Sequence, residues 1–179
     1  MASKQEVSHR MGRLYRYVGP KHLVALADAP VNRVLVRCPQ DIRRWIEQTG
    51  QELDPAGCVF ATYIVDTEGH LWIADRRIEH IACGRGQPVQ SAGEIVFCVK
   101  EEVDVEYVTN QSTGYCPEPE SWPAVAGALT SIGIEHPDSF SQEFLFRRCG
   151  HCGCINLIKN AAFECAVCGS ELETTWNLQ

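Results

Sequence analysis

Two copies of one short motif stand near the end of the chain: Cys149-Gly150-His151-Cys152-Gly153 and Cys165-Ala166-Val167-Cys168-Gly169. Both have the pattern Cys-x-x-Cys-Gly, and 12 residues lie between Cys152 and Cys165. Two cysteines three positions apart can hold one ion from a tight turn, and the following glycine readily adopts the positive φ that such a turn needs. The spacing therefore predicts a tetrahedral metal site built from Cys149, Cys152, Cys165 and Cys168.

The pattern resembles a zinc ribbon, which implies a bound Zn²⁺. Rubredoxin-like iron takes the same ligands, but the short separation and the absence of a Cys-Pro-x-Cys sequence favour zinc. Because four thiolates fill the shell, no position stays open for water, so we expect a structural metal without Lewis-acid chemistry. Cys154 lies two residues beyond the first pair; we interpret it as a neighbour, with a spare ligand as the alternative.

Length and composition predict one ordinary domain with a small appendage, since the chain has 179 residues of which 45% are apolar. It has neither an apolar run of 18 residues nor an apolar core in its first residues, so we expect no transmembrane helix and no export. Among the ten cysteines, Cys58 and Cys98 lie in apolar runs. We expect these two as buried free thiols in a reducing cytoplasm, and we reject a secreted disulfide framework.

The charge is distributed unevenly along the chain, whose net value is −7. Residues 1–22 carry five basic side chains and one acidic, whereas residues 23–142 carry 18 acidic and 8 basic. Because phosphates require a basic face, this acidic body disfavours nucleic acid as a partner. The basic arm at residues 1–12 is either a solvated, flexible terminus or a contact for an acidic partner.

Hydrophobic periodicity predicts an α+β fold, with a mixed or antiparallel sheet and two helices. Helical spacing and Pro39 favour a helix over residues 39–49, ended by Gly50, and Ser121 is expected to cap a second helix that runs to about residue 132. The expected strands are residues 34–36, a hairpin of 59–65 with 71–74, and a second hairpin of 94–100 with 103–109.

A break at residues 136–143 divides this organisation into an α+β domain at 13–140 and the ribbon at 141–179. Strands of the ribbon are expected at 143–147, 156–159 and 174–177. Trp176 is interpreted as a lid on the small core of the ribbon, with partner docking as the alternative.

Two polar segments are candidates for chemistry. We favour a surface loop with Asp–Arg pairs and a hydrogen-bonded histidine for the segment from Asp75 to Gly86, with acid–base chemistry by Asp75, Glu79 and His80 as the alternative. Its glycines lack the spacing of a nucleotide fingerprint. Glu94 opens an apolar strand and points either to solvent or into a cleft.

The other segment spans residues 110–117 and contains Asn110, Ser112 and Tyr115, whose side chains are all able to form hydrogen bonds. It is either a recognition loop for a small polar ligand or a self-bonded loop leading into the next helix. Cys116 is a weak candidate nucleophile, because no base can be assigned to it.

Residues 80–135 resemble a segment of plant IQ-motif calmodulin-binding proteins and of some bacterial toxin-associated domains. The resemblance rests on His80, on the sequence from Gly86 to Glu94, and on Ser112-Thr113-Gly114-Tyr115-Cys116-Pro117 before a helix. In that family the last motif contains a histidine that this chain lacks, and no IQ helix is present. The resemblance implies a shared β-rich scaffold and a grouping of His80, Glu94, Ser112 and Tyr115, but neither calmodulin binding nor an activity.

The sequence thus favours a cytoplasmic, bacterial zinc-ribbon protein that acts as an adaptor or accessory component by binding another protein. The ribbon, with Arg147, Arg148 and Lys159 beside it, is the expected docking surface. The alternative is an enzyme or small-ligand-binding domain. Its site would lie between the 75–94 and 110–116 loops, with Glu79, His80, Glu94, Asn110, Ser112 and Tyr115 as candidate residues.

Overall fold

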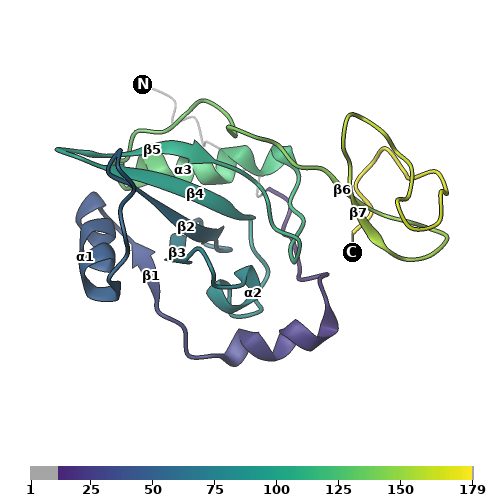
Figure 1. The fold of residues 1–179 in the computed structure, drawn as a ribbon, viewed down its shortest axis with the longest axis horizontal. Coiled ribbons are helices and arrows are strands. Elements are labelled where there is room, and N and C mark those ends of the chain that lie inside the picture. The colour runs from purple at the N-terminus through teal and green to yellow at the C-terminus, as the bar shows by residue number, and fades with distance from the viewer. Residues whose placement is uncertain (1–11, 179) are drawn as a thin grey trace, which may run out of the picture.

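A computed structural model describes residues 12–178 and confirms the α+β class. Five antiparallel strands form the main sheet in the order β1-β3-β2-β4-β5 (Figure 1). The two predicted hairpins supply four of its strands, because β2 pairs with β3 and β4 pairs with β5. The strands are β1 (Arg33–Val36), β2 (Cys58–Val65), β3 (Leu71–Asp75), β4 (Ser91–Val99) and β5 (Val103–Val108).

The first helix, α1 (Pro39–Thr49), confirms its prediction at both ends. The Asp41 carboxylate accepts the backbone N–H groups of Arg37 and Cys38, at 2.7 and 3.1 Å, and so stabilises the N-terminal turn. Gly50 follows the helix with a φ of 63°, a conformation that glycine adopts at no steric cost.

The second predicted helix is α3 (Trp122–Ser131), and Ser121 occupies its N-cap position, but without the expected side-chain cap. The Ser121 hydroxyl makes no capping hydrogen bond; it lies 2.9 Å from the hydroxyl of Ser91 inside the protein. Three short elements were not anticipated, because each is too short to give a periodic pattern. They are the 3₁₀ helices η1 (Lys21–Asp28) and η2 (Pro119–Ser121) and the one-turn helix α2 (His80–Cys83).

Apolar side chains cover both faces of the sheet, as the alternation of side chains along β2 requires. One face belongs to the largest core cluster, which contains Tyr63 of β2, Trp45 of α1 and Leu129 of α3. The other face carries Ile64, which belongs to a second cluster with Tyr115. This second cluster therefore holds the predicted polar loop against the sheet.

The ribbon contains a two-stranded sheet of β6 (Phe146–Arg148) and β7 (Ile155–Leu157), on the right in Figure 1. Residues 174–177, expected as a further strand, form none. The Asn177 side chain replaces strand pairing: it accepts the N–H of Arg148 at 2.8 Å and donates to the carbonyl of Arg148 at 2.8 Å.

A disulfide joins Cys58 to Cys98, which corrects the expectation that both are free thiols. The two cysteines are direct partners in the register of β2 and β4, and both are buried. Their apolar neighbours indicated burial, but the register that brings them together depends on strands 40 positions apart. The predicted arm at residues 1–12 lies almost entirely outside the described residues.

None of the helices within residues 12–178 has the length and apolar character needed to cross a membrane.

Gly93 is the tightest position in the sheet. A methyl group built on it would overlap the carbonyl oxygen of Thr109, because β4 and the end of β5 lie in close contact there. We expect Gly93→Ala to lower the free energy of unfolding by about 1–3 kcal/mol. Gly127→Ala is the matched control, since a Cβ at Gly127 meets nothing within 4 Å. Urea denaturation of both variants tests this, and equal stabilities would contradict the contact.

Candidate metal centre

Four cysteine sulfurs converge in the ribbon, as the motif spacing predicted. The Sγ atoms of Cys149, Cys152, Cys165 and Cys168 all lie within 4.8 Å of one another. Two cross-knuckle pairs, Cys149 with Cys168 and Cys152 with Cys165, are each 3.6 Å apart. A tetrahedron with metal–sulfur bonds of about 2.3 Å has sulfurs about 3.8 Å apart, so the four thiols fit one ion of this size.

Each cysteine pair stands on a turn of the same geometry. Gly153 and Gly169 follow the second cysteines with φ values of 75° and 72°. Their N–H groups donate to the carbonyls of Cys149 and Cys165, at 2.9 and 2.8 Å. Glycine after each pair thus closes the turn that aims two thiols in one direction.

Buried Asn156 of β7 supports the thiols from behind. Its Nδ2 lies 3.5 Å from the Sγ of Cys165, and its Oδ1 accepts the N–H of Ala166 at 3.0 Å. Hydrogen bonds from the backbone N–H groups of Val167 and Cys168 lower the pKa of Cys165 to about 6. This environment favours the thiolate, which is the form that binds a metal.

Cys154 does not belong to the group of four. Its carbonyl accepts the N–H of Cys149 at 2.8 Å, so the residue contributes through its backbone. With four thiolates around one ion, the first shell has no open position for a substrate or water. The chemistry available to this centre is therefore that of a structural cross-link.

We expect Cys149→Ser and Cys168→Ser to lose the metal and to unfold the ribbon, because metal binding supplies folding free energy in a closed site. Cys154→Ser is the control and should keep the wild-type metal content. Elemental analysis of the purified variants measures the stoichiometry directly. Full metal content in either ligand variant would refute the ligand assignment.

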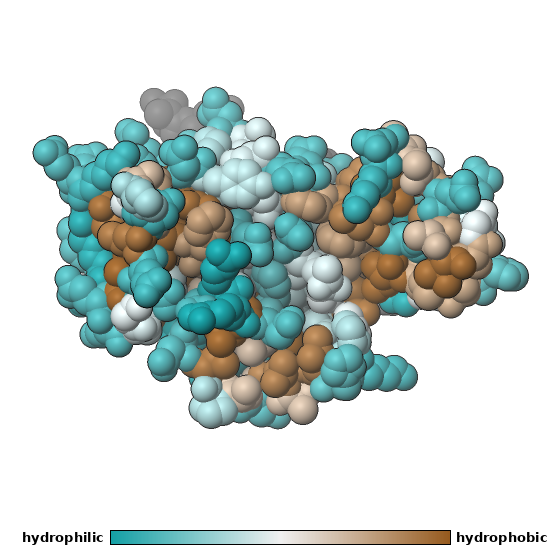
Figure 2. All heavy atoms as spheres, viewed as in Figure 1, coloured by the Kyte–Doolittle hydropathy of each residue, from teal (hydrophilic) through white to brown (hydrophobic). Residues whose placement is uncertain are grey.

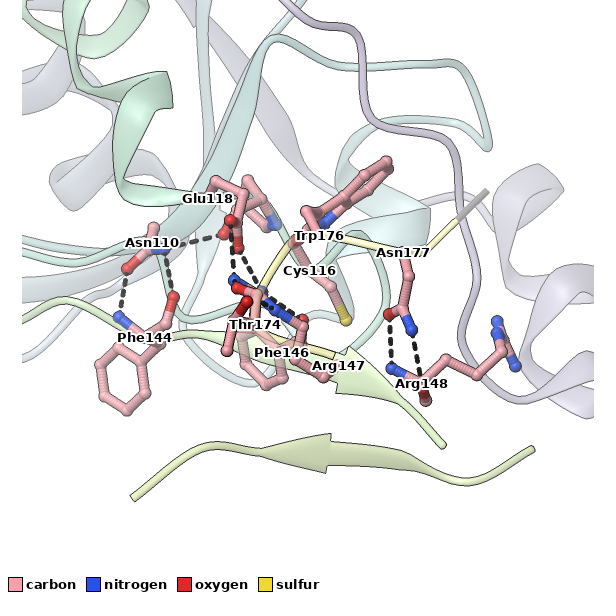
Figure 3. A network of polar contacts seen from close by, with 11 residues as sticks. Asn110, Cys116, Glu118, Phe144, Phe146, Arg147, Arg148, Thr174, Trp176 and Asn177 are labelled. Atoms are coloured by element: carbon pink, nitrogen blue, oxygen red, sulfur yellow. Dashed lines mark hydrogen bonds and ion pairs between the residues drawn. The ribbon is translucent and has the colours of Figure 1, made fainter. Parts of the chain in front are cut away.

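The base of the ribbon is fixed to the body by a buried ion pair (Figure 3). Arg147 of β6 donates to both carboxylate oxygens of Glu118, at 2.8 and 3.2 Å, and the two residues are 3% and 7% exposed. Arg147 was expected on a docking surface, and that expectation is wrong. Its remaining N–H groups bind the carbonyls of Phe146 and Thr174, so all of its donors lie inside the protein.

Trp176 also joins the ribbon to the body, whereas it was expected to be a lid on the ribbon core. Its indole N–H donates to the carbonyl of Cys116 at 3.0 Å, and its ring lies edge-on to Tyr15 at 5.6 Å. Asn110 forms a third link, because its amide exchanges two hydrogen bonds of 2.8 Å with the backbone of Phe144 just before β6 (Figure 3). The ribbon thus has one defined orientation on the body.

The candidate residues of the first polar segment lie in different surroundings. The Nε2–H of His80 donates to the carbonyl of Gly93 at 2.9 Å and ties α2 to β4. Glu94 follows that glycine and is half-buried, whereas Glu79 is exposed. Of these three residues, only His80 has a side-chain hydrogen bond within the described part of the chain.

The candidates of the second segment are all buried. The Asn110 amide also donates to the carbonyl of Pro117 at 2.8 Å, and the Ser112 hydroxyl accepts the N–H of Tyr115 at 3.2 Å. The Tyr115 hydroxyl donates to the carbonyl of Gln87 at 2.9 Å, which joins the two polar segments. The segments therefore converge in space, and the contacts that join them are hydrogen bonds to the backbone.

Sequence reasoning missed two features. Asp66, Glu68 and His70 gather in the turn between β2 and β3, where the ring of His70 lies 3.4 Å from each carboxylate. A groove of about 1350 Å³ separates α3 from the end of the ribbon. The group of Asp66, Glu68 and His70 was missed because the turn sequence indicated only a hairpin. The groove was missed because it depends on contacts between segments far apart in the sequence.

No family model, curated protein or solved structure matches this chain. The resemblance of residues 80–135 to plant IQ-motif proteins and bacterial toxin-associated domains receives no support from these comparisons.

His80 should make stability depend on pH. Burial lowers its pKa below the usual 6.5, so the folded protein holds this ring neutral where the unfolded chain already binds a proton. Stability is then fully present above pH 6.5 and falls as the pH drops below it, by at most about 1.4 kcal/mol per pH unit. We expect His80→Gln to flatten this slope in urea titrations between pH 7 and 5. An unchanged slope would contradict the assignment.

Proposed function

We propose that this chain is a zinc-stapled protein-binding module, an adaptor whose ribbon presents a docking surface to another protein. The closed set of four thiolates supports Zn²⁺ as the ion, since zinc prefers tetrahedral sulfur sites and has no redox chemistry to control. The ion would be bound by Cys149, Cys152, Cys165 and Cys168. Its only role would be to make the ribbon rigid.

The observation that carries the proposal is the exposure of Val167 at the tip of the second knuckle. Among the large apolar side chains of residues 12–178, Val167 is the most exposed, at 68%. Neighbouring Ala166 is exposed, and Leu157 of β7 is 37% exposed. Figure 2 shows apolar surface at the ribbon end of the molecule, on the right of the view.

The base and the tip of the ribbon have opposite characters. At the base, the Arg147 guanidinium and the Phe144 N–H form hydrogen bonds with Glu118 and Asn110 of the body. The apolar side chain at the tip has no such partner within the core clusters. An apolar group held out on a rigid support is the arrangement expected of a contact residue.

The alternative, a small-ligand site between the 75–94 and 110–116 loops, gains no support from the contacts described. Backbone carbonyls accept hydrogen bonds from the side chains of His80, Asn110 and Tyr115. A ligand that used them would first have to displace these internal hydrogen bonds, which makes them costly to recruit.

We expect Val167→Asp to abolish co-purification of the partner from the native host while leaving the zinc content unchanged. The matched control is Val24→Asp, which places the same charge on a valine that is 50% exposed in η1. Quantitative mass spectrometry of the captured proteins compares the variants with wild type. Retention of every captured protein by Val167→Asp would refute the ribbon tip as the docking surface.

A further inference from the structure

The groove between α3 and the ribbon has a volume of about 1350 Å³. Pro123, Gly127 and Ser131 line it from α3 at four-residue spacing, which places them on one face of the helix. Thr174, Thr175 and Trp176 line it from the end of the ribbon. Two parts of the chain far apart in sequence thus form one channel.

The helix side of this groove has the composition of a covered surface. None of the ten residues of α3, WPAVAGALTS, carries a charge, although solvent-facing helix surfaces usually do. Gly127 is exposed, and a Cβ added to it would meet nothing within 4 Å. The small side chains leave room for an extended segment to lie close to the helix.

The chain itself leads into the groove from its N-terminal side. Tyr15 pairs with Val89 through two backbone hydrogen bonds of 2.8 and 2.9 Å, which fix the chain at this point. Two residues upstream, the Arg13 guanidinium lies 4.7 Å from the ring centre of Trp176, and both Arg13 and Gly12 line the groove. Gly12, the first residue that the structure describes, therefore lies at the groove wall.

Charge and length fit this segment to the groove. Glu118 and Arg147 neutralise each other, which leaves Glu68 and Glu120 against Arg13 among the other charged side chains of the described lining. Residues 1–11 carry the basic Lys4 and Arg10 against the acidic Glu6, and Val7 is the one apolar residue between the two basic ones. Eleven extended residues span up to about 36 Å, and the short tether gives an effective concentration in the millimolar range.

We propose that residues 1–11 bind in this groove as an intramolecular peptide ligand. The groove is then a site for an extended, basic segment, and the chain supplies its own occupant. This inference is independent of the docking role of the ribbon tip, because it uses the opposite end of the ribbon. It also connects the occupant to the metal, since the residues at 174–176 hold their place only while the ribbon is folded.

Limited trypsin digestion of the metal-loaded full chain tests the proposal, because trypsin cleaves after Lys4 and Arg10. Gly127→Leu adds a bulky side chain at the groove wall, where a Cβ meets nothing within 4 Å, and Gln48→Leu adds the same side chain to the exposed surface of α1. We expect wild type and Gln48→Leu to be cut at both sites about tenfold more slowly than a synthetic peptide of residues 1–15. Gly127→Leu should be cut as fast as the peptide.

The charge variant Glu68→Lys/Glu120→Lys provides a second test that leaves the helix packing unchanged. We expect it to accelerate cleavage after Lys4 and Arg10, whereas Glu101→Lys/Glu102→Lys, outside the groove lining, should have no effect. Cleavage of wild type at the rate of the free peptide, unchanged by either groove variant, would overturn the proposal.

Discussion

The ion pair between Glu118 and Arg147 is the interaction on which the arrangement of the two parts of the chain depends. Both side chains are buried. The guanidinium donates hydrogen bonds to the Glu118 carboxylate and to the carbonyls of Phe146 and Thr174. Removing one partner of such a pair leaves an uncompensated charge in the interior, at a cost of about 3–5 kcal/mol. Because Thr174 belongs to the last segment of the ribbon, the same guanidinium orders β6, the chain end and the wall of the groove.

The four-cysteine cluster and the ion pair order different parts of the ribbon. The four thiols define its interior, where Asn156 and the knuckle glycines set their directions. The pair at the base defines its orientation on the body. Asn110 serves the same end, since its side chain holds the backbone of Phe144 that leads to the ribbon, whereas the Tyr115 hydroxyl donates to the carbonyl of Gln87 in the body. Side chains that resemble a catalytic set in sequence can thus be the internal hydrogen bonds of an irregular segment.

Local signals in the sequence were enough to predict the two longer helices and the strands of the main sheet. Helical periodicity and Pro39 located α1, alternation located both hairpins, and Cys-x-x-Cys-Gly spacing located the metal ligands. Long-range pairings were beyond those signals. Arg147 reads as a surface charge until Glu118, 29 positions earlier, is placed beside it. The partnership of Cys58 with Cys98 likewise depends on strand register, which composition does not encode.

Differential scanning calorimetry of the metal-loaded chain tests most directly whether the ribbon and the body are one structural unit. If the buried pair and its neighbouring hydrogen bonds couple them, the chain unfolds in a single transition whose calorimetric and van't Hoff enthalpies agree. A separate transition for the ribbon, with the body melting independently of metal removal, would contradict this account.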